Sequence, residues 1–75
     1  MDREIEKLTE TAKAVVAHYK TITQTEYDTF QESVVDLIAD LLHLLRKEGV
    51  DANEVIALAE SHHIAEIEDA KAVDD

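Results

Sequence analysis

The chain has 75 residues, enough for one small domain, and its 18 acidic residues against 7 basic ones give a formal net charge of −11. Such an anionic chain does not neutralise nucleic-acid phosphates and is not attracted to an anionic membrane surface. The absence of cysteine excludes disulfide frameworks, thiolate metal sites and cysteine nucleophiles. The sequence has no apolar run long enough to span a bilayer and no signal-peptide pattern at its charged start, so we expect a cytoplasmic protein.

The composition predicts helix throughout the chain. Proline is absent and glycine occurs once, so the residues that punctuate strands and turns are missing, whereas good helix formers are abundant. The first helix is predicted over residues 3–22, where apolar residues recur at three- and four-residue steps and so share one side of a helix. These residues are Ile5, Leu8, Ala12, Val15, Val16, Tyr19 and Ile22.

The joint between the first two helices is predicted at Thr23. Thr23 and Glu26 have the spacing of a capping box, in which each side chain bonds the backbone of the other residue. Thr25 with Asp28 is the competing choice of cap. The second helix is therefore predicted over residues 24–48.

The second helix has the widest apolar face in the chain. The face covers nearly half of the circumference, more than one neighbouring helix would cover, so this helix is predicted to be the central element. The helix is expected to end at Gly49, the only glycine, in a left-handed conformation. The residues of the face are Tyr27, Phe30, Val34, Val35, Leu37, Ile38, Leu41, Leu42, Leu44 and Leu45.

The third helix is predicted over residues 52–68, with Asp51 as its N-cap and Glu54 completing a capping box. The tail at 69–75 is expected to fray, because acidic residues at a helix C-terminus oppose the helix dipole.

The predicted fold is a single all-α domain over residues 1–75, a three-helix up-down-up bundle with short connections, and dimerisation through the second helix is left open. The residues expected in its core are Leu8, Val15, Tyr19, Phe30, Val34, Leu37, Leu41, Leu45, Val55, Ile56 and Ala59.

The negative charge is concentrated in the second and third helices. Residues 1–22 carry four acidic and four basic residues, residues 23–48 carry six and two, and residues 49–75 carry eight and one. A face with this excess of carboxylates complements a basic groove. The residues predicted to contact such a partner are Asp36, Asp40, Glu54, Glu60, Glu66, Glu68 and Asp69.

The sequence offers two clusters of polar side chains as candidate chemical sites. A row of side chains on the second helix could hold a divalent cation through oxygen ligands, but a solvated polar face is the favoured interpretation. Adjacent histidines in the third helix are expected to pack at the edge of the core, with pH sensing as the alternative. We predict no catalytic residue, no metal site and no cofactor. The groups are Glu32, Asp36, Asp40 and His43, and His62 with His63.

The stretch from Glu32 to Asp51, with the segment from Val55 to His63, resembles a group of small helical proteins encoded by bacteriophages, prophages and other mobile elements. The similarity covers residues 30–66 and includes a Val-Asp-Leu-Ile-Ala-Asp-Leu-Leu-His helix, a Gly-Val-Asp turn and a His pair. The resemblance implies an origin on such an element. These elements often carry small acidic proteins that inhibit host nucleic-acid machinery, including restriction enzymes and CRISPR effector complexes.

A second likeness is to the all-α nucleoside triphosphate pyrophosphohydrolases of the MazG type. Their metal motif pairs a Glu with an Asp three residues later in a Leu-rich helix, whereas Asp36 and Asp40 are four residues apart here. The earlier pair of that family has no counterpart, because Glu6 and Glu10 are also four residues apart.

Three functions follow from these observations. The leading one is a non-enzymatic inhibitor of anti-CRISPR or anti-restriction type, whose acidic face mimics nucleic acid and binds a basic host protein. The first alternative is a homo-oligomeric helical module with a structural or regulatory role. The further alternative is a Mg²⁺-dependent nucleoside triphosphate pyrophosphohydrolase.

Overall fold

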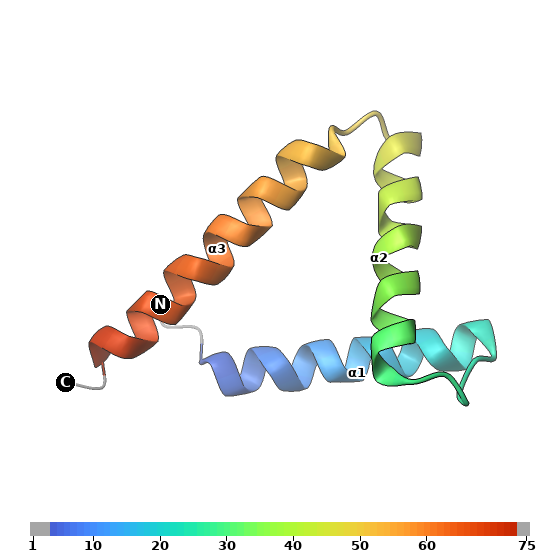
Figure 1. Ribbon diagram of the computed structural model, residues 1–75, viewed down its shortest axis with the longest axis horizontal. Helices are drawn as coiled ribbons and strands as arrows, with labels where there is room; N and C mark the ends of the chain where they lie inside the picture. Colours follow the sequence, from blue (N-terminus) through green and yellow to red (C-terminus); the bar gives the residue numbers. More distant parts are fainter. Residues whose placement is uncertain (1–3, 74–75) are drawn as a thin grey trace.

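The computed structural model describes residues 4–73, with side chains for residues 4–70. Its elements are three α-helices, α1 (Ile5–Thr23), α2 (Phe30–Lys47) and α3 (Ala52–Val73) (Figure 1). The all-α, three-helix architecture predicted from the sequence is confirmed. In the part of the chain that the structure describes, each helix is too short or too polar to cross a membrane.

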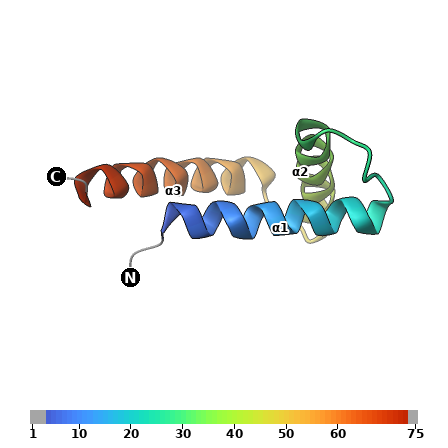
Figure 2. The same ribbon diagram turned by 90° about the horizontal axis from the view of Figure 1, so that it is seen from below.

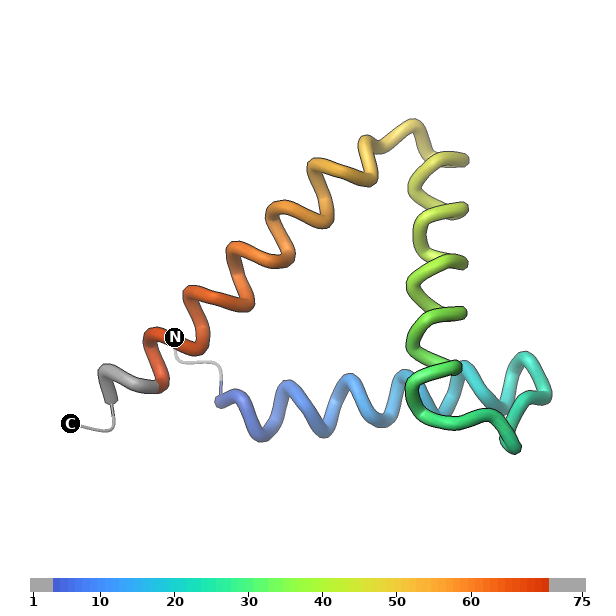
Figure 3. The backbone as a smooth tube through the Cα atoms, viewed as in Figure 1, coloured from blue at the N-terminus to red at the C-terminus, as the bar shows by residue number. Residues whose placement is uncertain are grey.

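The helices form the three sides of an open triangle (Figures 1 and 3). α2 crosses the second half of α1, and α3 runs back from the far end of α2 toward the first turns of α1, as the view from below also shows (Figure 2). The radius of gyration is 14.8 Å, against about 11 Å for a compact domain of this length. The helices therefore meet near the corners of the triangle and leave much of their length without a neighbour.

The start of α2 corrects the sequence prediction. We expected the helix to begin at residue 24 under a Thr23 cap, but it begins at Phe30, with Thr29 as its N-cap. The Thr29 hydroxyl accepts a hydrogen bond from the Glu32 backbone N–H at 3.1 Å, and the Glu32 carboxylate accepts one from the Thr29 backbone N–H at 2.8 Å. Thr23 uses its hydroxyl within α1, where it donates to a backbone carbonyl oxygen at 2.9 Å. Of the overlapping threonine–acid pairs in this stretch, the last one forms the capping box.

The end of α1 explains why the prediction carried the second helix too far back. Gln24 adopts a left-handed conformation, with φ of 58°. The Thr25 N–H then donates to the Lys20 carbonyl oxygen at 2.9 Å, which closes the helix end. A non-glycine residue costs about 1 kcal/mol or more in this conformation. Backbone hydrogen bonds therefore hold the end of α1, and no glycine in the sequence marks it.

The corner between α2 and α3 follows the sequence prediction closely. Gly49 has φ of 72°, so the expected left-handed residue stands at the end of α2. The Asp51 carboxylate accepts hydrogen bonds from the backbone N–H groups of Asn53 at 2.9 Å and Glu54 at 3.3 Å. The predicted N-cap of the third helix is confirmed.

The C-terminal part of α3 corrects a second expectation. Fraying was predicted from residue 69 onward, but the helix continues through Val73. Acidic residues at an exposed helix end cost only a few tenths of a kcal/mol each, which neighbouring alanines of high helix propensity offset. Residues 74 and 75 of the predicted tail lie outside the described residues.

The open triangle buries far less than the predicted core. Among residues 4–70, the buried residues are Val16 of α1, 9% exposed, and Ser33 in the first turn of α2, 0% exposed. Small side chains let helix backbones approach closely, and we place the crossing of α1 and α2 at these two residues. The expected core residues that are half-buried are Leu8, Tyr19, Val34, Leu37, Leu45 and Val55. Those that are exposed are Val15, Phe30, Leu41, Ile56 and Ala59.

Candidate binding surface

The structure divides the predicted partner-binding residues between two sides of the triangle. Asp36 and Asp40 lie on α2, beside its crossing with α1, whereas the other five lie along α3 (Figure 1). The carboxylates of α3 also point in several directions, because successive residues of a helix are rotated by about 100°. Glu54, Glu60, Glu68 and Asp69 are exposed, and Glu66 is half-buried. The predicted residues therefore make two separate negative regions instead of a single face.

The region on α2 is built around a hydrogen bond between helices. The Tyr19 hydroxyl of α1 donates to the Asp40 carboxylate of α2 at 2.7 Å. The negative charges of Asp36 and Asp28 also act on this hydroxyl. We name the four carboxylates that follow one another at four-residue steps here, Asp28, Glu32, Asp36 and Asp40, the acidic corner.

Three members of the acidic corner, Asp40, Asp36 and Asp28, contribute to raising the pKa of Tyr19 from 10.0 to about 12. The hydrogen bond to Asp40 is the largest cause, because it is donated by the neutral phenol and lost by the phenolate. Partial loss of water and the negative charges of Asp40, Asp36 and Asp28 act in the same direction. Since the folded-state pKa is raised, the stabilising contribution of this contact is fully present below pH 10 and is lost as the pH rises through about 12.

This pKa can be measured on one residue, because the chain has only two tyrosines. In a Tyr27→Phe variant we expect the phenolate absorbance to rise with a midpoint at about 12, because only Tyr19 ionises. Adding Asp40→Ala should move the midpoint toward 10.0. Glu60→Ala removes a carboxylate on α3 and should leave it unchanged. A midpoint near 10.0 in the Tyr27→Phe variant, with the helical circular dichroism intact, would refute the contact.

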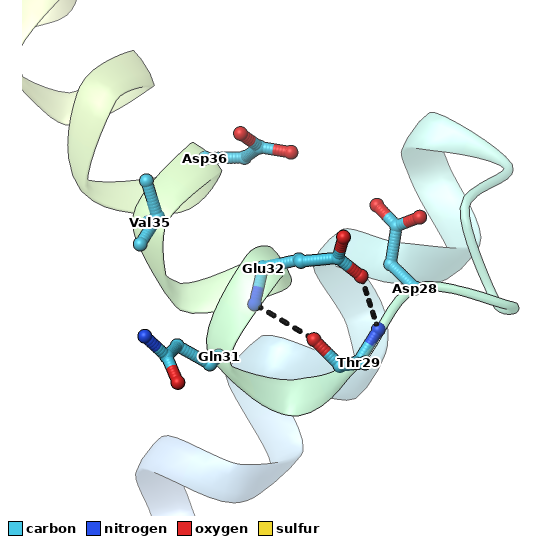
Figure 4. A pocket seen from close by; sticks show the side chains of 6 residues that line it. All are labelled: Asp28, Thr29, Gln31, Glu32, Val35 and Asp36. Atoms are coloured by element: carbon cyan, nitrogen blue, oxygen red, sulfur yellow. Dashed lines mark hydrogen bonds between the residues drawn. The ribbon is translucent and has the colours of Figure 1, made fainter.

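A shallow, open hollow lies on the outer side of the acidic corner (Figure 4). The carboxylates of Asp28, Glu32 and Asp36, which line the hollow, point toward a common space (Figure 4). Hydrogen bonds with Thr29 hold the pKa of the Glu32 carboxyl below its usual value of 4.5. The bond from the Thr29 backbone N–H has the larger effect, and the bond with the Thr29 hydroxyl has the smaller one. Asp28 was missed as a site residue, although its place in the four-residue series was visible in the sequence. The remaining lining residues are Gln31 and Val35.

The candidate cation row does not converge on a metal site. Among residues 4–70, no group of three or more histidine, aspartate or glutamate side chains is arranged to hold a metal ion. The Glu32 carboxylate accepts a hydrogen bond within the capping box, and the Asp40 carboxylate accepts one from Tyr19. Two of the four side chains in the row therefore have structural partners. His62 and His63 are both exposed on α3, where we had expected them to pack against the core.

No family model, curated protein or solved structure matches this chain. The likeness to proteins of mobile elements and the likeness to MazG-type enzymes both stay predictions. The functional argument therefore depends on the surfaces that the chain itself presents.

Proposed function

We propose that this chain is a small, non-enzymatic binding protein whose carboxylates dock onto a basic protein at the groove where that protein holds nucleic acid. The observation that carries the proposal is the separation of charge between the sides of the triangle. α1 and the residue before it, residues 4–23, have three acidic and three basic residues. Residues 49–70, which include most of α3, have six acidic residues and neither lysine nor arginine.

The exposure of these carboxylates supports a role in association. Glu60, Glu68 and Asp69 are exposed on α3, and the ion pair seen between described side chains lies on the neutral side, where Lys7 is 3.9 Å from Glu4. Cations of a partner would therefore meet carboxylates that the fold leaves in solvent. Complementary charge of this kind accelerates encounter and selects the partner, and its effect decreases with added salt.

The class of partner comes from the resemblance of residues 30–66 to proteins of mobile elements. Such an origin favours, as the binding partner, a host protein that handles nucleic acid and is of the kind targeted by anti-CRISPR or anti-restriction inhibitors. The acidic corner and α3 would then occupy positions that the phosphates of the natural ligand occupy.

The test compares two variants with equal change in net charge. Asp36→Asn, Glu60→Gln and Glu68→Gln together remove three of the proposed contacts. Glu4→Gln, Glu6→Gln and Glu10→Gln together remove three carboxylates from α1 and the residue before it. The immobilised wild-type chain should retain basic nucleic-acid-binding proteins from a bacterial lysate and release them to added oligonucleotide or to salt near 1 M, where the Debye length is only about 3 Å. The first variant should retain them at least about tenfold less well.

The proposal fails if the retained proteins are neither basic nor nucleic-acid-binding, or if salt does not release them. Equal losses in the two variants would show that net charge alone matters and would remove the assignment to α2 and α3. A homo-oligomeric helical module is the second candidate function, and the exposed apolar residues of α2 favour it.

A further inference from the structure

The single chain exposes more surface than a folded monomer of its mass. Its accessible surface is 6583 Å², whereas a compact monomer of 8.4 kDa exposes about 4,600 Å². The excess is therefore about 2,000 Å² for each chain and belongs to all three sides of the triangle, not to α2 alone. Two chains that covered this excess with each other would bury about 4,000 Å² in total, within the range of about 2,000–5,000 Å² for obligate dimers.

Exposed apolar residues occur on all three helices, and those of α2 include Phe30, Leu41 and Leu44. The residues at four- and three-residue steps form a stripe of the kind that packs against a second helix. Phe30 is 65% exposed, Leu41 49% and Leu44 53%, so α1 and α3 leave these three residues without a full cover. Val34 and Leu37 are half-buried within the chain. We name this set the α2 stripe; its members are Phe30, Val34, Leu37, Leu41 and Leu44.

The carboxylates of α2 lie away from the stripe. At about 100° for each residue, Glu32 and Asp36 fall on the opposite half of the helix from Leu41, and Asp40 turns toward Tyr19 on α1. A second chain can therefore cover the stripe without bringing carboxylates into an apolar contact, although each chain has a formal net charge of −11. Burial of unpaired charge would otherwise prevent such an association.

The helix dipole favours antiparallel pairing of two α2 helices, because the positive N-terminal end of each helix then lies beside the negative C-terminal end of its neighbour. The charged side chains at the ends of α2 are Glu32 in the first turn and Arg46 and Lys47 in the last turn. At about 100° for each residue, all three fall on the half of the helix opposite Leu41, so they lie away from the contact and do not select its direction.

We infer that two copies of this chain form a two-fold symmetric dimer in which the α2 stripes pack against each other in antiparallel directions. The stripe is centred on Leu37, so this residue meets its own copy across the symmetry axis. Leu44 of one chain lies opposite Phe30 of the other. The inference rests on area and apolar pattern. It names the contact surface of the second candidate function, the homo-oligomeric module, and does not depend on the proposed binding of a basic protein.

Cysteine cross-linking tests both the contact and its direction, because the natural chain has no cysteine. A disulfide requires Cα atoms within about 7 Å of each other. Leu37→Cys should form a covalent dimer under mild oxidation, and Leu44→Cys alone should not. A mixture of Leu44→Cys with Phe30→Cys should form the mixed dimer. Self-linkage of Leu44→Cys without the mixed product would overturn the antiparallel arrangement.

Light scattering on the unmodified chain tests the dimer itself. We expect a mass of two chains at micromolar concentration, and a monomer there would overturn the inference. Leu41→Glu places a charge in the stripe and should weaken dimerisation by at least about 100-fold while the chain stays helical. Leu58→Glu is the matched control, because Leu58 is 54% exposed on α3 and lies outside the stripe. Equal weakening in both variants would also contradict the proposed contact.

Discussion

Replacement of Ser33 with leucine should lower the free energy of unfolding by about 1–3 kcal/mol, the cost of forcing extra methylenes into a closely packed site. Ser33 is 0% exposed, in the first turn of α2, and we place it where this helix crosses α1. A leucine there must push the two helices apart, which also lengthens the hydrogen bond between Tyr19 and Asp40. For a chain with so small a core, this loss is a large part of the total stability.

The measurement is urea unfolding followed by circular dichroism, with the only other serine as control. Ser61 is exposed on α3, so Ser61→Leu should change the free energy of unfolding by less than about 0.5 kcal/mol. Ser33→Ala should be neutral or stabilising by about 1 kcal/mol, because the buried Ser33 hydroxyl oxygen has no hydrogen-bond partner among the residues that the structure describes. If Ser33→Leu and Ser61→Leu behaved alike, the close crossing of α1 and α2 would be wrong.

The helices themselves could be predicted because their signals are local. Apolar spacing within α1 and α2 shows helical periodicity, and Gly49 with Asp51 specifies the end of one helix and the start of the next. The joint after α1 could not be located in this way. Gln24 takes a left-handed conformation, which its residue type does not predict. The threonine–acid pairs that follow it all have the spacing of a capping box, so the pattern alone does not select one of them.

The arrangement of the helices could not be predicted, because an apolar stripe does not identify what covers it. The pattern around Leu41 fits an intramolecular bundle and a contact between two chains equally well. The structure leaves Leu41 and Phe30 exposed within one chain, so the intramolecular bundle does not cover them. Apolar periodicity identifies a helix face that can pack against another surface. It does not show whether that surface belongs to the same chain or to a second one.

The acidic surface was only partly predictable for a related reason. The counts of charge place the excess after residue 23, since counting needs no geometry. Within its observed bounds, however, α2 has three acidic and two basic residues, so most of the excess lies outside this helix. Asp28 was overlooked although the predicted helix over residues 24–48 included it, because its proximity to Tyr19 depends on the crossing of α1 with α2. Conversely, Glu66 was grouped with Glu60 by sequence position, although helical rotation carries it to the half-buried side of α3.

Leu41→Ala should lower the free energy of unfolding by about 2–5 kcal/mol for each chain if the α2 stripe is buried between two copies, the usual range for a leucine lost from a core. In a lone chain, where Leu41 is 49% exposed, the loss should be only about 1 kcal/mol.

Thermal unfolding at a low and a high protein concentration separates the two cases, because only an associating chain gains stability with concentration. The wild-type midpoint should rise with concentration, and Leu41→Ala should remove most of that rise. Leu58→Ala, the same substitution at a residue 54% exposed on α3, should preserve it. A wild-type midpoint that does not depend on concentration, with Leu41→Ala and Leu58→Ala equally mild, would leave the stripe as solvated surface and exclude the dimer as the source of stability.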